Sequence, residues 1–480
     1  MTDRVLKPVA KNKFIAITVL VALVGLFFGL LVIFSSKIAL MLLGASIAVP
    51  VVYASVAYPK FGIVMLILLE CFIFMFIRIG SDFPLGTLID FFQGLLILGF
   101  LLKQKKHANW KIYKNPVTVM ITIWIIYNFA QVINPTASSI LAWVYTIRSV
   151  AFSMLMYYIF LYNFNTKAYI KLIFKVWLGI SVFVAMYAVN QEFNGFFAFE
   201  EVGLQSEKVR SLLFIDGHWR KFSIYSDPVV FSYNMVLAAL ICFGLLWRQM
   251  ATYKKVILSL LCAFFLYVML FSGTRGAYVL FPAALALFAI LNFNKKVMVF
   301  SIIAVVFFIG IINMPTSNAY LVRFQTAFKP NDDPSFIVRK MNQKRIQPYI
   351  QSHPFGGGLG SVGVWGIRFA PDSYLAKFPP DSGYARIAVE LGWIGLFLFC
   401  IVMFTVLRAG VVHFFAIRDP ELKNYCMVTT LVIFALNIGN YPQEALTQFP
   451  SNVFFCMAIA LVNATYLVDK QTEMTEIETK

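Results

Sequence analysis

Two short basic segments carry residue types that suit phosphate chemistry. One is the turn Ser272–Gly276, in which Arg275 stands between glycines and hydroxyl residues. The other is the pair Arg220 and Lys221, shortly before Asp227-Pro228, where we expect Asp227 to cap a helix that begins at the proline. A guanidinium group can bind two phosphate oxygens at once. The alternatives are a charged turn that ends a helix and basic side chains that reach the membrane interface.

The hydrophilic segment 314–382 contains further candidates. It holds eight lysines and arginines against four aspartates, and this surplus suits an anionic ligand. Arg345 precedes Gly356 by ten intervening residues, and His353 lies between them. Asp381 stands just before the next apolar stretch, where it is a candidate general base. The alternative for Asp381 is a helix N-cap without a catalytic role.

Other motifs in the chain do not predict a cofactor. The sequence Gly358-Leu-Gly-Ser-Val-Gly363 fits the dinucleotide fingerprint but follows no expected strand. The four histidines lack the spacing of zinc ligands. We therefore expect neither a bound cofactor nor a metal.

Composition places most of this chain in lipid. Hydrophobic residues make up 60% of it, charged residues only 13%, and the mean hydropathy is +0.79. The net charge of +18 lies mostly in short connectors between apolar stretches, so it predicts topology and not a nucleic-acid surface. All six cysteines lie inside apolar stretches, which excludes a disulfide framework.

Apolar windows predict an all-α, polytopic bundle of about fourteen transmembrane helices. They fall near 14–34, 38–57, 61–79, 88–102, 117–133, 140–162, 170–190, 228–247, 256–272, 277–292, 297–313, 383–407, 426–440 and 451–468. Alternate connectors are basic, which predicts that both termini are cytoplasmic. The segments 191–227 and 314–382 are then external loops of one membrane domain, 1–480.

Charged residues within the apolar stretches should pair, because a lone charge in lipid is costly. We expect Glu70 to pair with Arg148, and Arg78 with Asp90, as structural contacts. The alternative is a proton or ion path. The two halves of the sequence show no matched broken helices of the kind found in transporters.

The ordered set of motifs resembles the O-antigen ligase/polymerase superfamily of bacterial envelope enzymes. The resemblance covers roughly residues 210–400, and the matching pieces are Arg220 ahead of Ser226-Asp227-Pro228, the turn Ser272–Gly276, the Arg345-to-Gly356 spacing with His353-Pro354-Phe355-Gly356, and Asp381–Tyr384 followed by Glu390-Leu391-Gly392. Members act in the inner membrane, on its periplasmic side, on sugar chains carried by undecaprenyl diphosphate. They use no nucleotide and require no metal.

The resemblance implies roles for particular residues. Arg220, Arg275 and Arg345 would hold the diphosphate, and Asp381, or His353 in its place, would deprotonate an acceptor hydroxyl. Four further residues would contact the substrate: Lys221, Arg339, Gly356 and Tyr384.

The expected activity is polymerisation of undecaprenyl-diphosphate-linked repeat units by inverting glycosyl transfer. Ligases of this superfamily place a His-Asn pair where this chain has Asp381-Ser382, which argues against a ligase, and the Arg345-to-Gly356 spacing favours a polymerase. The alternatives are a ligase of the same superfamily and a transporter of lipid-linked sugar. The expected partners are the lipid-linked oligosaccharide, the bilayer and, for a polymerase, a chain-length regulator; nucleic acid is not expected.

Overall fold

Long apolar helices make up most of the computed structural model, which describes residues 48–79, 85–106, 108–215, 217–329, 334–379 and 381–478, together with Gly25 and Gly29. Eleven of the helices in these ranges are long and apolar enough to cross a membrane. They are α3 (Pro59–Arg78), α4 (Leu85–Lys106), α5 (Pro116–Ala130), α6 (Ile140–Ile147) with α7 (Ser153–Asn163), α8 (Lys167–Phe193), α11 (Pro228–Leu246), α12 (Thr252–Met269), α14 (Lys295–Asn313), α18 (Gly383–Ala416), α19 (Pro420–Gly439) and α20 (Ser451–Glu478). Two shorter apolar helices are Ala48–Ala57 and α13 (Arg275–Leu291).

The predicted class, an all-α polytopic membrane bundle, is confirmed. Every predicted span from residue 61 onward corresponds to a helix in the structure. The predicted span 14–34 and most of 38–57 lie outside the described residues. Short helical turns complete the described chain: η1 (Trp110–Tyr113), η2 (Gln131–Ile133), the π-helical η3 (Arg148–Phe152) between α6 and α7, η4 (Leu270–Ser272) and η6 (Leu375–Lys377).

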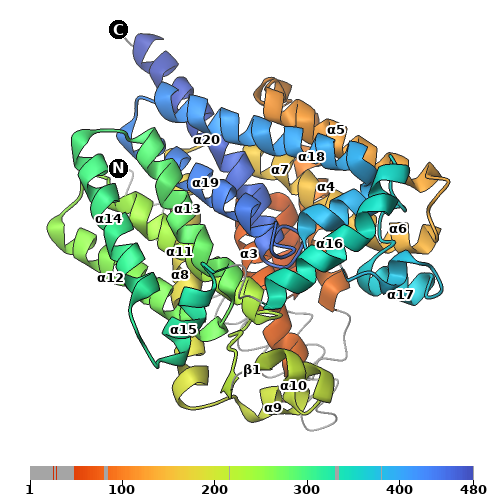
Figure 1. Ribbon diagram of the computed structural model, residues 1–480. Helices are drawn as coiled ribbons and strands as arrows, with labels where there is room; N and C mark the ends of the chain where they lie inside the picture. The colour runs from red at the N-terminus through yellow and green to blue at the C-terminus, as the bar shows by residue number, and fades with distance from the viewer. Residues whose placement is uncertain are drawn as a thin grey trace.

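The two long hydrophilic segments are themselves largely helical. The first contains α9 (Ala198–Leu204), α10 (Glu207–Leu213) and a hairpin of β1 (Phe214–Ile215) with β2 (His218–Trp219), paired antiparallel. The second contains α15 (Ala319–Thr326), α16 (Pro334–Ser352) and α17 (Gly363–Phe369). Figure 1 shows α9, α10 and β1 at the end of the molecule opposite to the C-terminal end of α20.

Several membrane helices begin with the same short sequence, a polar N-cap residue followed by proline. The cap side chain accepts hydrogen bonds from backbone N–H groups of the first turn, and proline fits the first helical position because no N–H is needed there. The pairs are Asn115-Pro116, Asp227-Pro228 and Asp419-Pro420. The prediction for Asp227 is thus confirmed: its Oδ1 lies 2.8 Å from the Val229 amide nitrogen.

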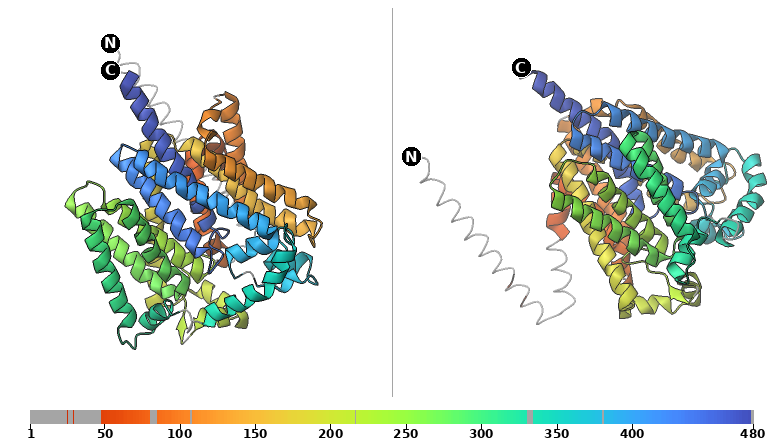
Figure 2. Two further views of the ribbon diagram at one scale, coloured as in Figure 1. Left: turned by 45° about the horizontal axis from the view of Figure 1, so that its top comes forward. Right: turned by 60° about the vertical axis from the view of Figure 1, so that its left-hand side comes forward.

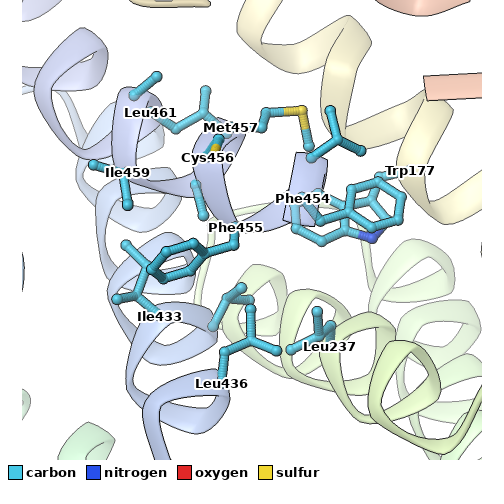
Figure 3. Close-up of a cluster of buried hydrophobic side chains, with 14 of the residues drawn as sticks. Trp177, Leu237, Ile433, Leu436, Phe454, Phe455, Cys456, Met457, Ile459 and Leu461 are labelled. Carbon is cyan, nitrogen blue, oxygen red and sulfur yellow. The ribbon is translucent and has the colours of Figure 1, made fainter. Parts of the chain in front are cut away.

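The core lies where α8, α11, α19 and α20 meet. The Trp177 and Phe454 rings stack there with centroids 4.3 Å apart, and Leu237 and Ile433 line the same cluster (Figure 3). α20 is buried along nearly its whole apolar length, whereas α14 exposes its apolar side chains. α14 stands at the edge of the bundle (Figures 1 and 2), so we expect it to face lipid.

Basic connectors gather at one end of the bundle. Lys167 pairs with Asp419 at 2.6 Å, and Arg248 pairs with Glu421 at 2.5 Å. These contacts join the starts of α8 and α19 to the end of α11. Connectors that the charge pattern predicts on one side of the membrane are therefore together in space.

The predicted pairs of buried charges are wrong. Arg148 pairs with Asp90 at 2.8 Å, while Glu70 accepts a hydrogen bond from Gln93. Arg78 donates instead to the Ser223 carbonyl oxygen at 2.9 Å. Hydropathy identifies the spans but not which spans are neighbours, and α4 packs against both α3 and α7.

Candidate active site

A sharp bend in α18 shapes the centre of the candidate site. Gly392 has φ +72°, a conformation that side chains disfavour, and it breaks the helix. The helix folds back there, because the rings of Tyr384 and Phe399, on either side of the bend, have centroids only 5.8 Å apart. The residues on either side of Gly392 are thus brought together at Tyr384 and Phe399.

The segment after α16 satisfies the backbone groups freed by this bend. Gly357 N–H donates to the Val389 carbonyl oxygen at 2.8 Å, and Gly358 N–H donates to that of Glu390 at 2.9 Å. Gly356 is buried against the bend with φ +71°, and a Cβ there would lie 2.5 Å from the Glu390 carbonyl oxygen. The motif around Gly356 therefore has a packing role that the sequence did not reveal.

Two arginines hold the turn Ser272–Gly276. Arg220 donates from Nε to the Ser272 carbonyl oxygen at 2.8 Å and from Nη2 to Thr274 Oγ1 at 3.1 Å. Arg323, on α15, donates from Nε to the Gly273 carbonyl oxygen at 2.8 Å. The turn carries Arg275 at the first position of α13. Three half-buried guanidinium groups thus gather around one turn.

This arginine cluster, Arg220, Arg275 and Arg323, concentrates positive charge. Burial, and then the nearby Arg323, lower the pKa of Arg220 to about 10, with Asp227 acting in the opposite direction. The Asp227 carboxylate is already engaged, because it accepts hydrogen bonds from the first turn of α11 and from Ser226. A group of this kind favours a bound anion, which would relieve the mutual repulsion of the cations.

Arg275 also lines a cavity of about 520 Å³ that we call the arginine cavity. Arg339 of α16 and Tyr384 of α18 lie on its wall, and most of the remaining lining is apolar: Val279, Ala327, Phe336, Leu407, Phe434 and Ile438. The Tyr384 hydroxyl donates to the Asn437 carbonyl oxygen at 3.1 Å, which fixes the ring. Two cations at an apolar cavity suit a phosphate that carries a hydrocarbon chain.

Asp381 lines a second cavity, of about 480 Å³, which we call the polar cavity. Its Oδ2 accepts a hydrogen bond from Asn342 at 3.1 Å. The N-cap of α18 is Ser382, so capping does not account for Asp381. Gly383 and Asn440 both line the polar cavity, and their chain neighbours Tyr384 and Tyr441 line the arginine cavity. The Gly383 N–H donates to the Asn440 carbonyl oxygen, and a Cβ on Gly383 would collide with the Asn440 side chain.

Five of the predicted site residues line neither cavity: Arg220 and Gly356, already described, and Arg345, His353 and Lys221. Arg345 is exposed on α16 and makes no ion pair or hydrogen bond within the described chain. His353 stacks on Tyr349 with centroids 3.9 Å apart. Lys221 is buried, its Nζ lies 3.6 Å from Glu192 Oε2, and burial lowers its pKa while Glu192 opposes the shift.

Sequence reasoning missed Arg323 as a site residue. It was one basic residue among eight in a hydrophilic segment, and no motif distinguishes it. Its position depends on α15 returning to a turn fifty residues earlier in the chain. The excess of lysine and arginine over aspartate was the available signal, and it indicated the segment but not the residue.

Residues 257–400 match the sequence model of a family described as O-antigen ligase. The match includes Arg275, Arg323, Arg339, Asp381 and Tyr384, and Arg220 precedes it. This confirms the resemblance to the O-antigen ligase/polymerase superfamily. No curated protein matches the chain.

Proposed function

We propose that this chain, an O-antigen ligase/polymerase-type protein by its family match, polymerises oligosaccharide repeat units carried on undecaprenyl diphosphate. The reaction takes place at the external, periplasmic face of the bacterial inner membrane, with both termini in the cytoplasm. The observation that carries the proposal is the position of Arg275, which belongs both to the arginine cluster and to the wall of an apolar cavity.

The arginine cavity is the proposed site of the lipid-linked donor. Its apolar wall suits the first isoprene units, and Arg275 and Arg339 suit the diphosphate. Negative charge on the diphosphate grows as the bond to the sugar breaks. Positioned cations therefore stabilise the transition state more than the bound substrate, and this difference accelerates the reaction.

Asp381 is the proposed general base. The acceptor hydroxyl gives its proton to the Asp381 carboxylate while its oxygen bonds to the anomeric carbon of the donor sugar. The bond from that carbon to the diphosphate oxygen breaks, and undecaprenyl diphosphate leaves with the electron pair. One displacement of this kind inverts the anomeric configuration. The hydrogen bond from Asn342 orients the carboxylate for this step.

Substitution of Arg275 tests the donor site. In a deletion strain that carries the variant gene, we expect Arg275→Ala to lower polymer synthesis about 100- to 1,000-fold, the usual effect of removing one transition-state donor. Lys340→Ala is the matched control, because Lys340 is an exposed cation on α16 that lines neither cavity. Normal chain lengths in Arg275→Ala, at normal protein level, would refute the assignment.

Lipid-linked intermediates of the deletion strain separate the related functions. Single repeat units on undecaprenyl diphosphate would indicate a polymerase. Full-length chains that remain on that carrier would indicate a ligase, the function named in the description of the matching family. Intermediates confined to the cytoplasmic leaflet would indicate a transporter.

A further inference from the structure

The polar cavity differs in chemistry from the arginine cavity. Its charged lining residues are Asp381, Arg386, Glu390 and Glu444, so carboxylates outnumber cations. Arg386 donates to Glu390 Oε1 at 3.1 Å and to Glu444 Oε2 at 2.6 Å, and this single arginine serves both acids. The surplus of negative charge disfavours a second phosphate. It suits a neutral ligand whose hydroxyl groups donate hydrogen bonds.

Two buried polar atoms on the wall of this cavity lack partners within the described part of the chain. They are Oδ1 of Asn128, a residue that is 0% exposed, and Oγ1 of Thr146, a residue that is 4% exposed. Asn128 uses its Nδ2 to bind the Trp124 carbonyl oxygen, which leaves the acceptor atom unused. Buried polar atoms without partners are costly, so a ligand that supplies the missing hydrogen bonds gains affinity.

Aromatic side chains line the same cavity. Trp124 and Phe399 pack together with centroids 5.4 Å apart, and Trp365 and Phe455 lie elsewhere on the lining. A pyranose ring has apolar C–H faces and a polar rim of hydroxyl groups. Aromatic faces can cover the former, while amide, hydroxyl and carboxylate groups bind the latter.

We infer that the polar cavity binds a sugar ring of the acceptor oligosaccharide. The inference rests on the proposed function in one respect: the ring is assigned to the acceptor because Asp381, the proposed base, lines this cavity. The donor diphosphate is assigned to the arginine cavity, whose lining residues Tyr384 and Tyr441 directly follow Gly383 and Asn440 of the polar cavity in the chain. The hydroxyl to be glycosylated lies at Asp381, and the inner hydroxyls face Asn128 and Thr146.

Thr146→Val gives a sharp test, because the change removes an unpartnered hydroxyl and keeps the shape of the side chain. If Thr146 has only a structural role, the variant is at least as stable as the unsubstituted protein and binds the oligosaccharide with unchanged affinity. If it binds sugar, affinity for the free repeat-unit oligosaccharide, prepared by partial hydrolysis of the cell's surface polysaccharide, falls about fivefold to tenfold. Quenching of Trp124 and Trp365 fluorescence in the purified full-length protein reports this binding. Thr429→Val, at a buried threonine away from the cavity, is the control.

Binding of the free oligosaccharide needs neither diphosphate nor turnover, so this test is independent of the polymerase assignment. Weaker binding in Thr146→Val and unchanged binding in Thr429→Val supports the inference, whatever chains the Arg275→Ala variant makes. Wild-type affinity in Thr146→Val overturns it. Competition by sugar-free undecaprenyl diphosphate would place donor groups in this cavity, and that result overturns it as well.

Discussion

At the scale of single residues, the arginines divide into two kinds by what they contact. Arg220 and Arg323 donate to backbone oxygens of the Ser272–Gly276 turn, so each positions the turn as well as adding charge. Arg275 and Arg339 line the arginine cavity. A guanidinium group that donates to a carbonyl oxygen from a fixed fork cannot be replaced by lysine without moving the turn.

Asp381 allows a test of the chemical step apart from binding. Asp381→Asn keeps the size of the side chain, but the amide cannot take a proton. We expect kcat for polymer formation to fall about 100- to 10,000-fold, with little change in KM for the lipid-linked substrate. Asp372→Asn changes an exposed aspartate of the same hydrophilic segment and serves as the control. An Asp381→Asn enzyme with wild-type kcat would show that another group accepts the proton.

At the scale of elements, the bend of α18 and the segment 353–361 form one unit. At the bend, the carbonyl oxygens of Val389 and Glu390 accept hydrogen bonds from the N–H groups of Gly357 and Gly358. Tyr384, in the first turn of α18, lines the arginine cavity, and Asp381, just before the helix, lines the polar cavity. The start of the bent helix therefore contributes to both cavities.

Gly356→Ala should disrupt this unit. The added methyl group would press on the Glu390 carbonyl oxygen and would also disfavour the positive φ. We expect the unfolding free energy to fall by about 1–3 kcal/mol, together with a loss of activity. Thermal unfolding in detergent measures the first effect. Gly179→Ala in α8, where a Cβ has open space, should leave Tm unchanged or raise it slightly. Equal Tm values for the two variants would contradict the proposed packing role.

The features that the sequence predicted depend on residues close together in the chain, whereas those that it did not predict depend on residues far apart. Spans and the Asp227 cap depend on neighbouring residues, and both were predicted because hydropathy and capping are local. The bend at Gly392 needs partners from residues 354–358, and the turn needs Arg323 from α15. No local pattern states which distant segment supplies such a partner. The Glu70–Arg148 pairing failed for the same reason.

At the scale of the whole molecule, two cavities of opposite character share the same two segments of chain: Gly383 and Asn440 line the polar cavity, and their neighbours Tyr384 and Tyr441 line the arginine cavity. The arginine cavity holds cations and apolar groups, whereas the polar cavity holds an excess of carboxylates and aromatic rings. A transferase needs such a separation, because the leaving group is anionic and the nucleophile must lose a proton. Placing the base among the arginines would lower its basicity.

The ends of the bundle should face opposite sides of the membrane. Lys254 lies in the first turn of α12, at the end of the bundle that we place in the cytoplasm, and Lys340 is exposed on α16 in the segment that we place outside. We expect Lys340→Cys to react with an impermeant maleimide in spheroplasts, and Lys254→Cys to react only after lysis. The unsubstituted chain is the control: its cysteines lie in apolar helices, where thiolates form poorly, so it should stay unlabelled. Labelling of Lys254→Cys in sealed spheroplasts would reverse the orientation and move both cavities to the cytoplasmic side, where an external polymerase could not work.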